Sequence, residues 1–160
     1  MSSPLLMLTL AAALGSAVVA GVFFAFSTFV MAGLGRLAPA RGVEAMQSIN
    51  VTAINPWFMS ALFGTAALSL ALLVAGLEDL GSARGRCLFA AALLYLVGAI
   101  AVTMAANQPQ NRKLGGFEPG SAAAAGYWPD YLARWLVWNH IRTLLALIAA
   151  GLEIAAIHVG

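Results

Sequence analysis

Four long apolar stretches constrain this chain more than any other feature of its sequence. Three of them, at about 5–34, 56–77 and 87–106, contain no charged residue, and the fourth, at about 135–158, contains very few. A helix needs about 20 mostly apolar residues to cross a bilayer. In lipid the backbone must satisfy its own hydrogen bonds, which forces helices. The sequence therefore predicts an all-α integral membrane protein, with four spans in an antiparallel bundle.

The composition supports lipid as the solvent of this chain. It has 160 residues, of which 62% are hydrophobic and only 9% charged. A soluble domain has roughly 25% charged residues. The length predicts one domain over residues 1–160. The 8 lysines and arginines are scattered and form no basic stripe, so we expect the lipid bilayer as a partner and no nucleic acid.

The segment between the first two spans is predicted to contain a short interfacial helix. Val43, Met46 and Asn50 fall at helical spacing within it. Asn55 is a residue type that caps helix N-termini. Pro56 follows it, at a position where helices accept proline. The second span is therefore expected to begin at Pro56.

The segment 107–135 is predicted to be the longest loop. It contains several glycines and prolines that favour turns, Pro109 and Pro129 among them. Trp128 and Tyr131 are interpreted as anchors at the membrane surface, because tryptophan and tyrosine are enriched there.

Most of the amide side chains are expected to gather at one end of the bundle. In an antiparallel bundle, the ends of spans one and three lie beside the starts of spans two and four. Trp135, Asn139 and Arg142 are spaced by four and three residues, so they share one face of the fourth helix. A lipid-facing arginine would cost at least about 2.5 kcal/mol near mid-membrane. This pattern predicts a polar pocket, although a cluster that only locks the helices together is an alternative.

Four motifs resemble those of a known family. Residues 107–111 read as NxPxN, and residues 135–143 read as WxxWNxxRT. They are joined by GVFFAFS at residues 21–27 and MQSIN at residues 46–50. Together, and in this order, they are similar to a family of four-helix membrane proteins that was long of unknown function. That family includes the anthrone oxygenases of aromatic polyketide pathways.

The resemblance implies an oxygenase that converts an anthrone, or a hydroquinone-like aromatic, with molecular oxygen. Such enzymes are expected to need no metal or flavin, so no cofactor is predicted here. The single cysteine and the two distant histidines also give no local metal signature. The expected small-molecule partners are a planar aromatic ligand and molecular oxygen.

The chemistry of an anthrone indicates which residues to consider. Loss of a proton from the CH2 group that is conjugated with the carbonyl gives an electron-rich anion that can itself reduce oxygen, so the protein needs a base, oxyanion stabilisation and a dry aromatic pocket. Arg142 is predicted to stabilise the oxyanion, Asn139 to donate a hydrogen bond, and His140 to act as base, with water or Glu44 as alternative bases. The predicted substrate-binding residues are Phe26, Gln47, Asn50, Asn55, Asn107, Asn111, Trp135 and Trp138.

A second hypothesis is a non-enzymatic membrane protein that binds a small molecule or assists a larger complex. Oxygen uptake in the presence of an anthrone would separate the two. A transporter or channel is less favoured, because no broken helix, repeat or full-depth polar stripe is visible. More cations lie near the motif end than near Arg84 and Arg86. By the positive-inside rule this predicts that the motif end faces the cytoplasm. We expect the membrane to be the cell membrane. The oligomeric state stays open, a homo-oligomer included.

Overall fold

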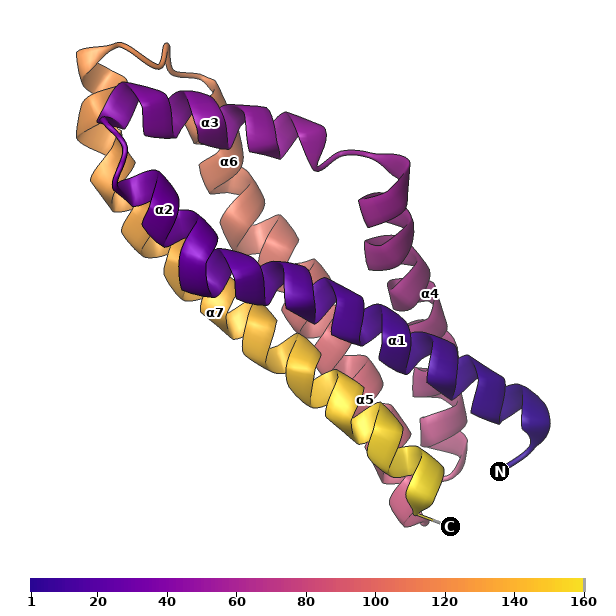
Figure 1. Ribbon diagram of the computed structural model, residues 1–160. Coiled ribbons are helices and arrows are strands. Elements are labelled where there is room, and N and C mark those ends of the chain that lie inside the picture. Colours follow the sequence, from indigo (N-terminus) through magenta and orange to yellow (C-terminus); the bar gives the residue numbers. More distant parts are fainter. Residues whose placement is uncertain (160) are drawn as a thin grey trace.

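The structure is a bundle of four long, apolar helices, each long enough to cross a membrane (Figure 1). It is a computed structural model that describes residues 1–159, and within that range it contains helices, turns and short connections but no strand. The four spans are Ser3–Gly35, Pro56–Glu78, Ala83–Gly115 and Ala122–His158. The prediction of an all-α integral membrane bundle is therefore confirmed.

Two of the spans change their helical geometry along their length. The first span is built from α1 (Ser3–Ala25), the π-helical turn η1 (Phe26–Val30) and α2 (Met31–Gly35). The third span is built from α5 (Ala83–Tyr95), η2 (Leu96–Ala101), η3 (Thr103–Asn107) and α6 (Gln108–Gly115), of which η2 and η3 are π-helical. The second and fourth spans are α4 (Pro56–Glu78) and α7 (Ala122–His158).

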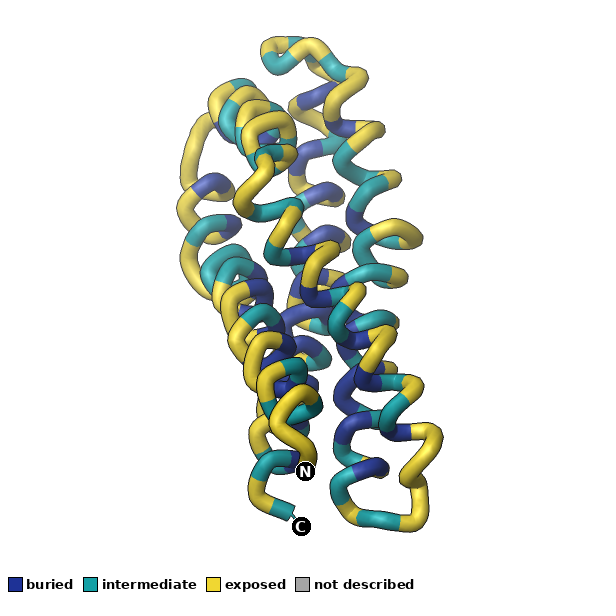
Figure 2. Tube along the Cα trace, turned by 90° about the vertical axis from the view of Figure 1, so that its right-hand side faces the viewer, coloured by how far each residue is buried: buried dark blue, intermediate teal, exposed yellow. Residues whose placement is uncertain are grey.

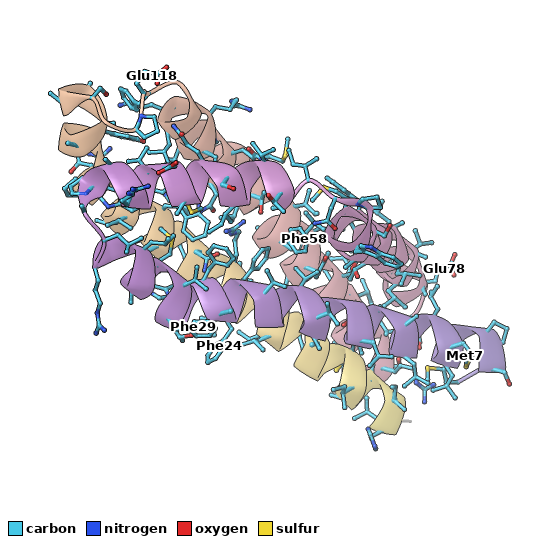
Figure 3. The ribbon with its side chains drawn as sticks, turned by 45° about the horizontal axis from the view of Figure 1, so that its top comes forward. Met7, Phe24, Phe29, Phe58, Glu78 and Glu118 are labelled. Atoms are coloured by element: carbon cyan, nitrogen blue, oxygen red, sulfur yellow. The ribbon has the colours of Figure 1, made fainter. Side chains whose placement is uncertain are left out.

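The four spans close into a ring in which α7 packs against α1 and α5, and α4 packs against the same two helices. Small residues permit the close approach. A Cβ atom added to Gly98 would lie 2.5 Å from the Cβ of Leu145, so η2 and α7 could not pack this closely around any other residue. Buried positions face the inside of the bundle and exposed ones face outward (Figure 2). Phe24 and Phe29, for example, point away from α1 into the surroundings (Figure 3).

The predicted interfacial helix is present as α3 (Pro39–Thr52), which crosses one end of the bundle (Figure 1). It contacts α2, α6 and α7. Val43 and Met46 are buried on its inner face. The predicted start of α4 is also confirmed, because the side chain of Asn55 accepts a hydrogen bond from the backbone nitrogen of Phe58 at 3.0 Å.

The prediction of a long loop over 107–135 is wrong. Helix α6 runs on to Gly115, and α7 already begins at Ala122, so only a short connection remains. Pro129 lies inside α7. Alanines favour a helix at this point, the hydroxyl of Ser121 caps it at Ala124, and burial of one helix face outweighs the cost of the proline.

Trp128 and Tyr131 are also corrected, because they are 3% and 0% exposed and do not anchor the chain at a membrane surface. Both pack in a cluster with Met31, Val43 and Met46. Trp128 stacks on Tyr131 with ring centroids 5.6 Å apart. These aromatic rings therefore bind α3 and the end of the first span to α7.

Candidate functional site

A cavity of about 430 Å³ lies beneath α3 and between the spans. A volume of this size suits a small organic molecule. Phe58, which lines the cavity, lies between α1 and the junction of α3 with α4 (Figure 3). The apolar wall is formed by Val22, Phe23, Phe26, Met46, Ile49, Ala53, Ile54, Phe58, Met59, Leu62 and Trp135. The polar groups that line it are Asn50, Thr52, Asn55, Thr103, Gln108, Asn111, Asn139 and Arg142.

Arg142 is the only charged residue on this wall, and it is 5% exposed. Its Nη1 donates to the hydroxyl of Thr103 at 2.9 Å, and its Nη2 donates to Oδ1 of Asn139 at 2.6 Å. The guanidinium lies over the ring of Phe23 at 4.2 Å and near that of Trp135 at 5.2 Å. It is therefore fixed in position by two polar and two aromatic neighbours.

Among residues 1–159, no acidic side chain is paired with Arg142. The cavity wall contains no aspartate or glutamate. The one ion pair found within residues 1–159 joins Arg41 to Glu44 on the exposed side of α3, at 3.2 Å. The guanidinium is thus a buried positive charge that only neutral groups solvate, and such a charge favours an anion in the adjoining cavity.

Asn139 joins the first and fourth spans. Its Nδ2 donates to the carbonyl oxygen of Phe23 at 2.7 Å and to the hydroxyl of Ser27 at 2.8 Å. Ser27 in turn lies 3.0 Å from the hydroxyl of Thr143. With both donors used on α1 and η1, Asn139 presents its oxygen to Arg142 and so fixes the direction of the guanidinium.

Asn111 orients the aromatic wall. Its Oδ1 accepts hydrogen bonds from the Tyr131 hydroxyl at 2.9 Å and from Trp135 Nε1 at 2.8 Å. The ring of Trp135 then lies 5.6 Å from that of Phe26 across the cavity wall. Asn107 does not line the cavity; it is 1% exposed and donates to the backbone oxygen of Trp135 at 3.1 Å.

The π-helical turns carry several of these contacts. Phe26 and Ser27 belong to η1, whereas Thr103 belongs to η3. A π-helical turn contains more residues than an α-turn, so it changes which side chains face inward, and such turns are frequent at functional sites. Here η3 supplies the Thr103 hydroxyl that accepts from Arg142, and η1 supplies Phe26, whose ring packs against Trp135.

Two predicted site residues lie on the outer surface of α7. His140 is exposed, and Trp138 is 41% exposed, both on the outer side of α7. Glu44, an alternative base, is also exposed and is paired with Arg41. Because these side chains face away from the cavity, the structure gives no support to His140 or Glu44 as base, or to Trp138 as part of the aromatic slot.

The remaining predicted residues belong to α3 and its C-terminal end. Asn50 and Asn55 line the cavity, whereas Gln47 does not. The Nε2 of Gln47 donates to the backbone oxygens of Leu114 and Phe117 at 2.9 and 2.8 Å. Gln47 therefore connects α3 to the end of the third span.

Sequence reasoning did not identify several residues that line the cavity. Phe23 belongs to the GVFFAFS motif, Gln108 to the NxPxN motif, and Thr103 lies four residues before Asn107. Phe23 and Gln108 could have been proposed as members of these motifs, and Thr103 by extending the NxPxN motif by one helical turn. Phe58 and Met59 carry no such signal, because their position depends on how α4 meets α3.

The comparisons with known proteins agree with the geometry. A family model described as anthrone oxygenase matches residues 55–152, more than half of the chain. No curated protein and no solved structure matches the chain. The matched segment includes Asn111, Asn139 and Arg142. Phe26 and Asn50 lie outside that segment but line the same cavity. The chain belongs to the anthrone oxygenase family.

Proposed function

We propose that this protein is a membrane oxygenase that binds a flat, anthrone-like or hydroquinone-like aromatic substrate and stabilises its anion against Arg142. The observation that carries the proposal is the buried guanidinium without a counter-ion at the wall of an apolar cavity. A desolvated cation next to an apolar pocket binds an oxyanion far better than it binds the neutral parent compound. Membership of the family supports an oxygenase-type activity.

The reaction balances without any further reactant. An anthrone loses a proton from the methylene carbon opposite its carbonyl in the central ring, and the resulting anion, whose charge is delocalised onto the carbonyl oxygen, transfers electrons to molecular oxygen. Carbon–oxygen bond formation gives a hydroperoxide, which loses water to leave the anthraquinone. Overall, one anthrone and one oxygen molecule give one anthraquinone and one water. The substrate is the reductant, so the protein has only to favour the anion and to hold it in a dry site.

Each part of the cavity wall has a role in this scheme. Arg142 faces the developing oxyanion, and Asn139 and Thr103 keep it in place. Phe26 and Trp135 offer ring faces for a planar ligand. Among the described residues the wall contains no aspartate, glutamate, histidine or cysteine, so we propose that water accepts the proton and that the anion is favoured by Arg142.

We also propose that the protein resides in the cell membrane, with the end that α3 crosses on the cytoplasmic side. The cations near that end support this orientation under the positive-inside rule. They are Arg36, Arg41, Arg112, Lys113 and Arg134. A poorly soluble aromatic would then reach the cavity from the membrane. A reporter fused to the loop at Gly120 should report the cytoplasmic side and one fused to the loop at Gly81 the opposite side, and the reverse result would contradict this orientation.

Oxygen uptake by the purified protein tests the activity. Anthrone is added to protein in lipid nanodiscs, and uptake is recorded beside the spontaneous rate in empty discs. We expect uptake and anthraquinone to appear in equal amounts at a rate that follows protein concentration. Ligand binding with no uptake above the empty discs, for anthrone and for a panel of hydroquinones, would instead support the non-enzymatic binding protein.

A further inference from the structure

A second cavity adjoins the first one. It has a volume of about 420 Å³ and lies between α3 and α6. Asn50, Ile54, Gln108 and Asn111 line both cavities, so the two share a wall. We call the first the inner cavity and this second one the outer chamber. The outer chamber is completed by Gln47, Val51, Arg112 and Gly115.

The outer chamber, like the inner cavity, has one guanidinium on its wall. Arg112 is its one charged residue, and no aspartate or glutamate lines it. Within residues 1–159 the Arg112 guanidinium takes part in no ion pair and no hydrogen bond. Its neighbour Lys113, by contrast, lies over the ring of Tyr127 at 4.3 Å and does not line the chamber.

Besides the Arg112 guanidinium, the wall shared by the two cavities contains amide side chains that can donate hydrogen bonds to a ligand. The Nδ2 of Asn50 is buried and has no hydrogen-bond partner. The oxygen of Asn111 is already occupied by Tyr131 and Trp135, which leaves its Nδ2 to face a ligand. A buried donor without a partner is unfavourable unless a ligand or water satisfies it. Both amides lie between the inner cavity and Arg112.

We propose that the outer chamber binds a carboxylate substituent of the aromatic ligand whose ring system occupies the inner cavity. This inference rests on the proposed function and narrows its substrate to an anthrone-type compound that bears an acidic group. In the inner cavity the one guanidinium, that of Arg142, is engaged by the substrate oxyanion, so a carboxylate on the same ligand would need a second cation to offset its burial. The planar guanidinium of Arg112 offers a pair of donors that match the two oxygens of a carboxylate.

The test compares two stable product analogues, anthraquinone and its carboxylated derivative, by quenching of tryptophan fluorescence. The protein is held in nanodiscs of zwitterionic lipid. The measured quantity is the ratio of the two dissociation constants, which is the preference for the acid. In Arg112→Gln we expect this preference to fall by about twofold to fivefold, as for the loss of one exposed charge pair.

Lys113→Gln is the matched control, because it removes the same charge from the next residue without altering the chamber. It should keep the preference of the wild type. Added salt should weaken binding of the carboxylated ligand to the wild type, but have little effect on it in Arg112→Gln. Repeating the titration in discs with anionic lipid shows whether a lipid phosphate competes for the same guanidinium.

The outcomes separate this inference from the proposed function. An unchanged preference in Arg112→Gln, or an equal fall in Lys113→Gln, would overturn the carboxylate site while leaving the inner cavity intact. Complete loss of the preference in anionic discs would assign Arg112 to lipid headgroups and also overturn it. Failure of both ligands to bind the wild type would contradict the proposed function and this inference together.

Discussion

The Nη2 atom of Arg142 lies 2.6 Å from Oδ1 of Asn139, one turn earlier on α7. Because Asn139 is itself fixed by donating to Phe23 and Ser27, the buried cation is held by the first span as well as by its own helix. The guanidinium therefore does not need to reorganise when an anion forms beside it. Preorganisation of this kind is a major source of rate enhancement in enzymes.

Replacing Arg142 with lysine should be damaging although the charge is kept. An ammonium group cannot donate to Thr103, Asn139 and a ligand in the fixed planar geometry of a guanidinium. We expect the protein-dependent rate of oxygen uptake to fall by about a hundredfold. Arg134→Lys, at an exposed position of the same helix, is the control and should retain the rate. Wild-type uptake in Arg142→Lys would show that only the charge matters there.

The hydroxyl group of Thr103 should be needed for the stability of the bundle. It accepts the hydrogen bond of Arg142 Nη1 at 2.9 Å and donates to the Ala99 backbone oxygen at 2.6 Å. Thr103→Val keeps the shape but leaves a buried donor of Arg142 unpaired, which should lower the free energy of unfolding by about 1–3 kcal/mol. Thr103→Ser should behave like the wild type. Equal stability of the valine and serine variants in thermal unfolding would argue against this hydrogen bond.

Asn111→Ala should destabilise the bundle because it leaves the donors of Tyr131 and Trp135 unpaired. We expect a loss of about 2 kcal/mol. The same substitution made in a Tyr131→Phe, Trp135→Phe background should cost clearly less, since those donors are then absent. Denaturant unfolding of the wild type, Asn111→Ala, the Tyr131→Phe, Trp135→Phe variant and the triple variant gives the coupling energy between Asn111 and the two donors. If the changes in the free energy of unfolding simply add, Asn111 stabilises the bundle through other contacts.

His140 and Glu44 should both be dispensable for oxygen uptake. Their side chains are exposed, and neither residue lines the cavity. His140→Ala and Glu44→Gln should therefore retain the wild-type rate within about twofold, as expected for surface substitutions. A large loss in either variant, with folding intact, would restore that residue as a candidate base.

Among the described residues, Glu153 is the buried acidic residue of the bundle, and its negative charge should not be needed for stability. It is 0% exposed, and neither oxygen of its carboxyl group has a hydrogen-bond partner. No cation is paired with it among the described residues. Glu153→Gln should thus change the free energy of unfolding by less than about 1 kcal/mol, whereas Glu153→Ala should cost about 2 kcal/mol through the space it leaves. A glutamine variant as unstable as the alanine variant would mean that the carboxyl group itself is required.

The sequence predicted the fold well because lipid leaves few alternatives. Apolar length defined the spans, and helical spacing defined the face shared by Trp135, Asn139 and Arg142. The pattern could not show that the segment around Pro129 is helical, because the burial of Trp128 and Tyr131 against α3 decides it. This packing is a long-range contact that local spacing does not contain.

Only part of the site was predicted, because local spacing again does not contain everything that decides which side chains line the cavity. Arg142, Asn139, Asn111 and Trp135 follow from motif spacing and line the cavity together. Asn107 belongs to the same motif but is turned toward the backbone of Trp135. The π-helical turns η1 and η3 rotate the side chains that follow them, and no simple residue pattern marks such turns. The outward direction of His140 could have been predicted, because it does not share the face of Asn139, whereas Trp138 is three residues from Trp135 and four from Arg142, so its spacing alone did not reveal its outward direction.

The ionisation of a coloured ligand in the cavity tests the central claim most directly. A hydroxyanthraquinone changes its visible spectrum when its hydroxyl group ionises, so the spectrum of the bound ligand reports its own charge. If Arg142 stabilises an oxyanion, the bound ligand should ionise at a pH at least about one unit lower than in empty nanodiscs, equivalent to about 1.4 kcal/mol. The shift should be lost in Arg142→Gln. A ligand that binds the wild-type protein but ionises at the same pH as in empty discs would contradict the account.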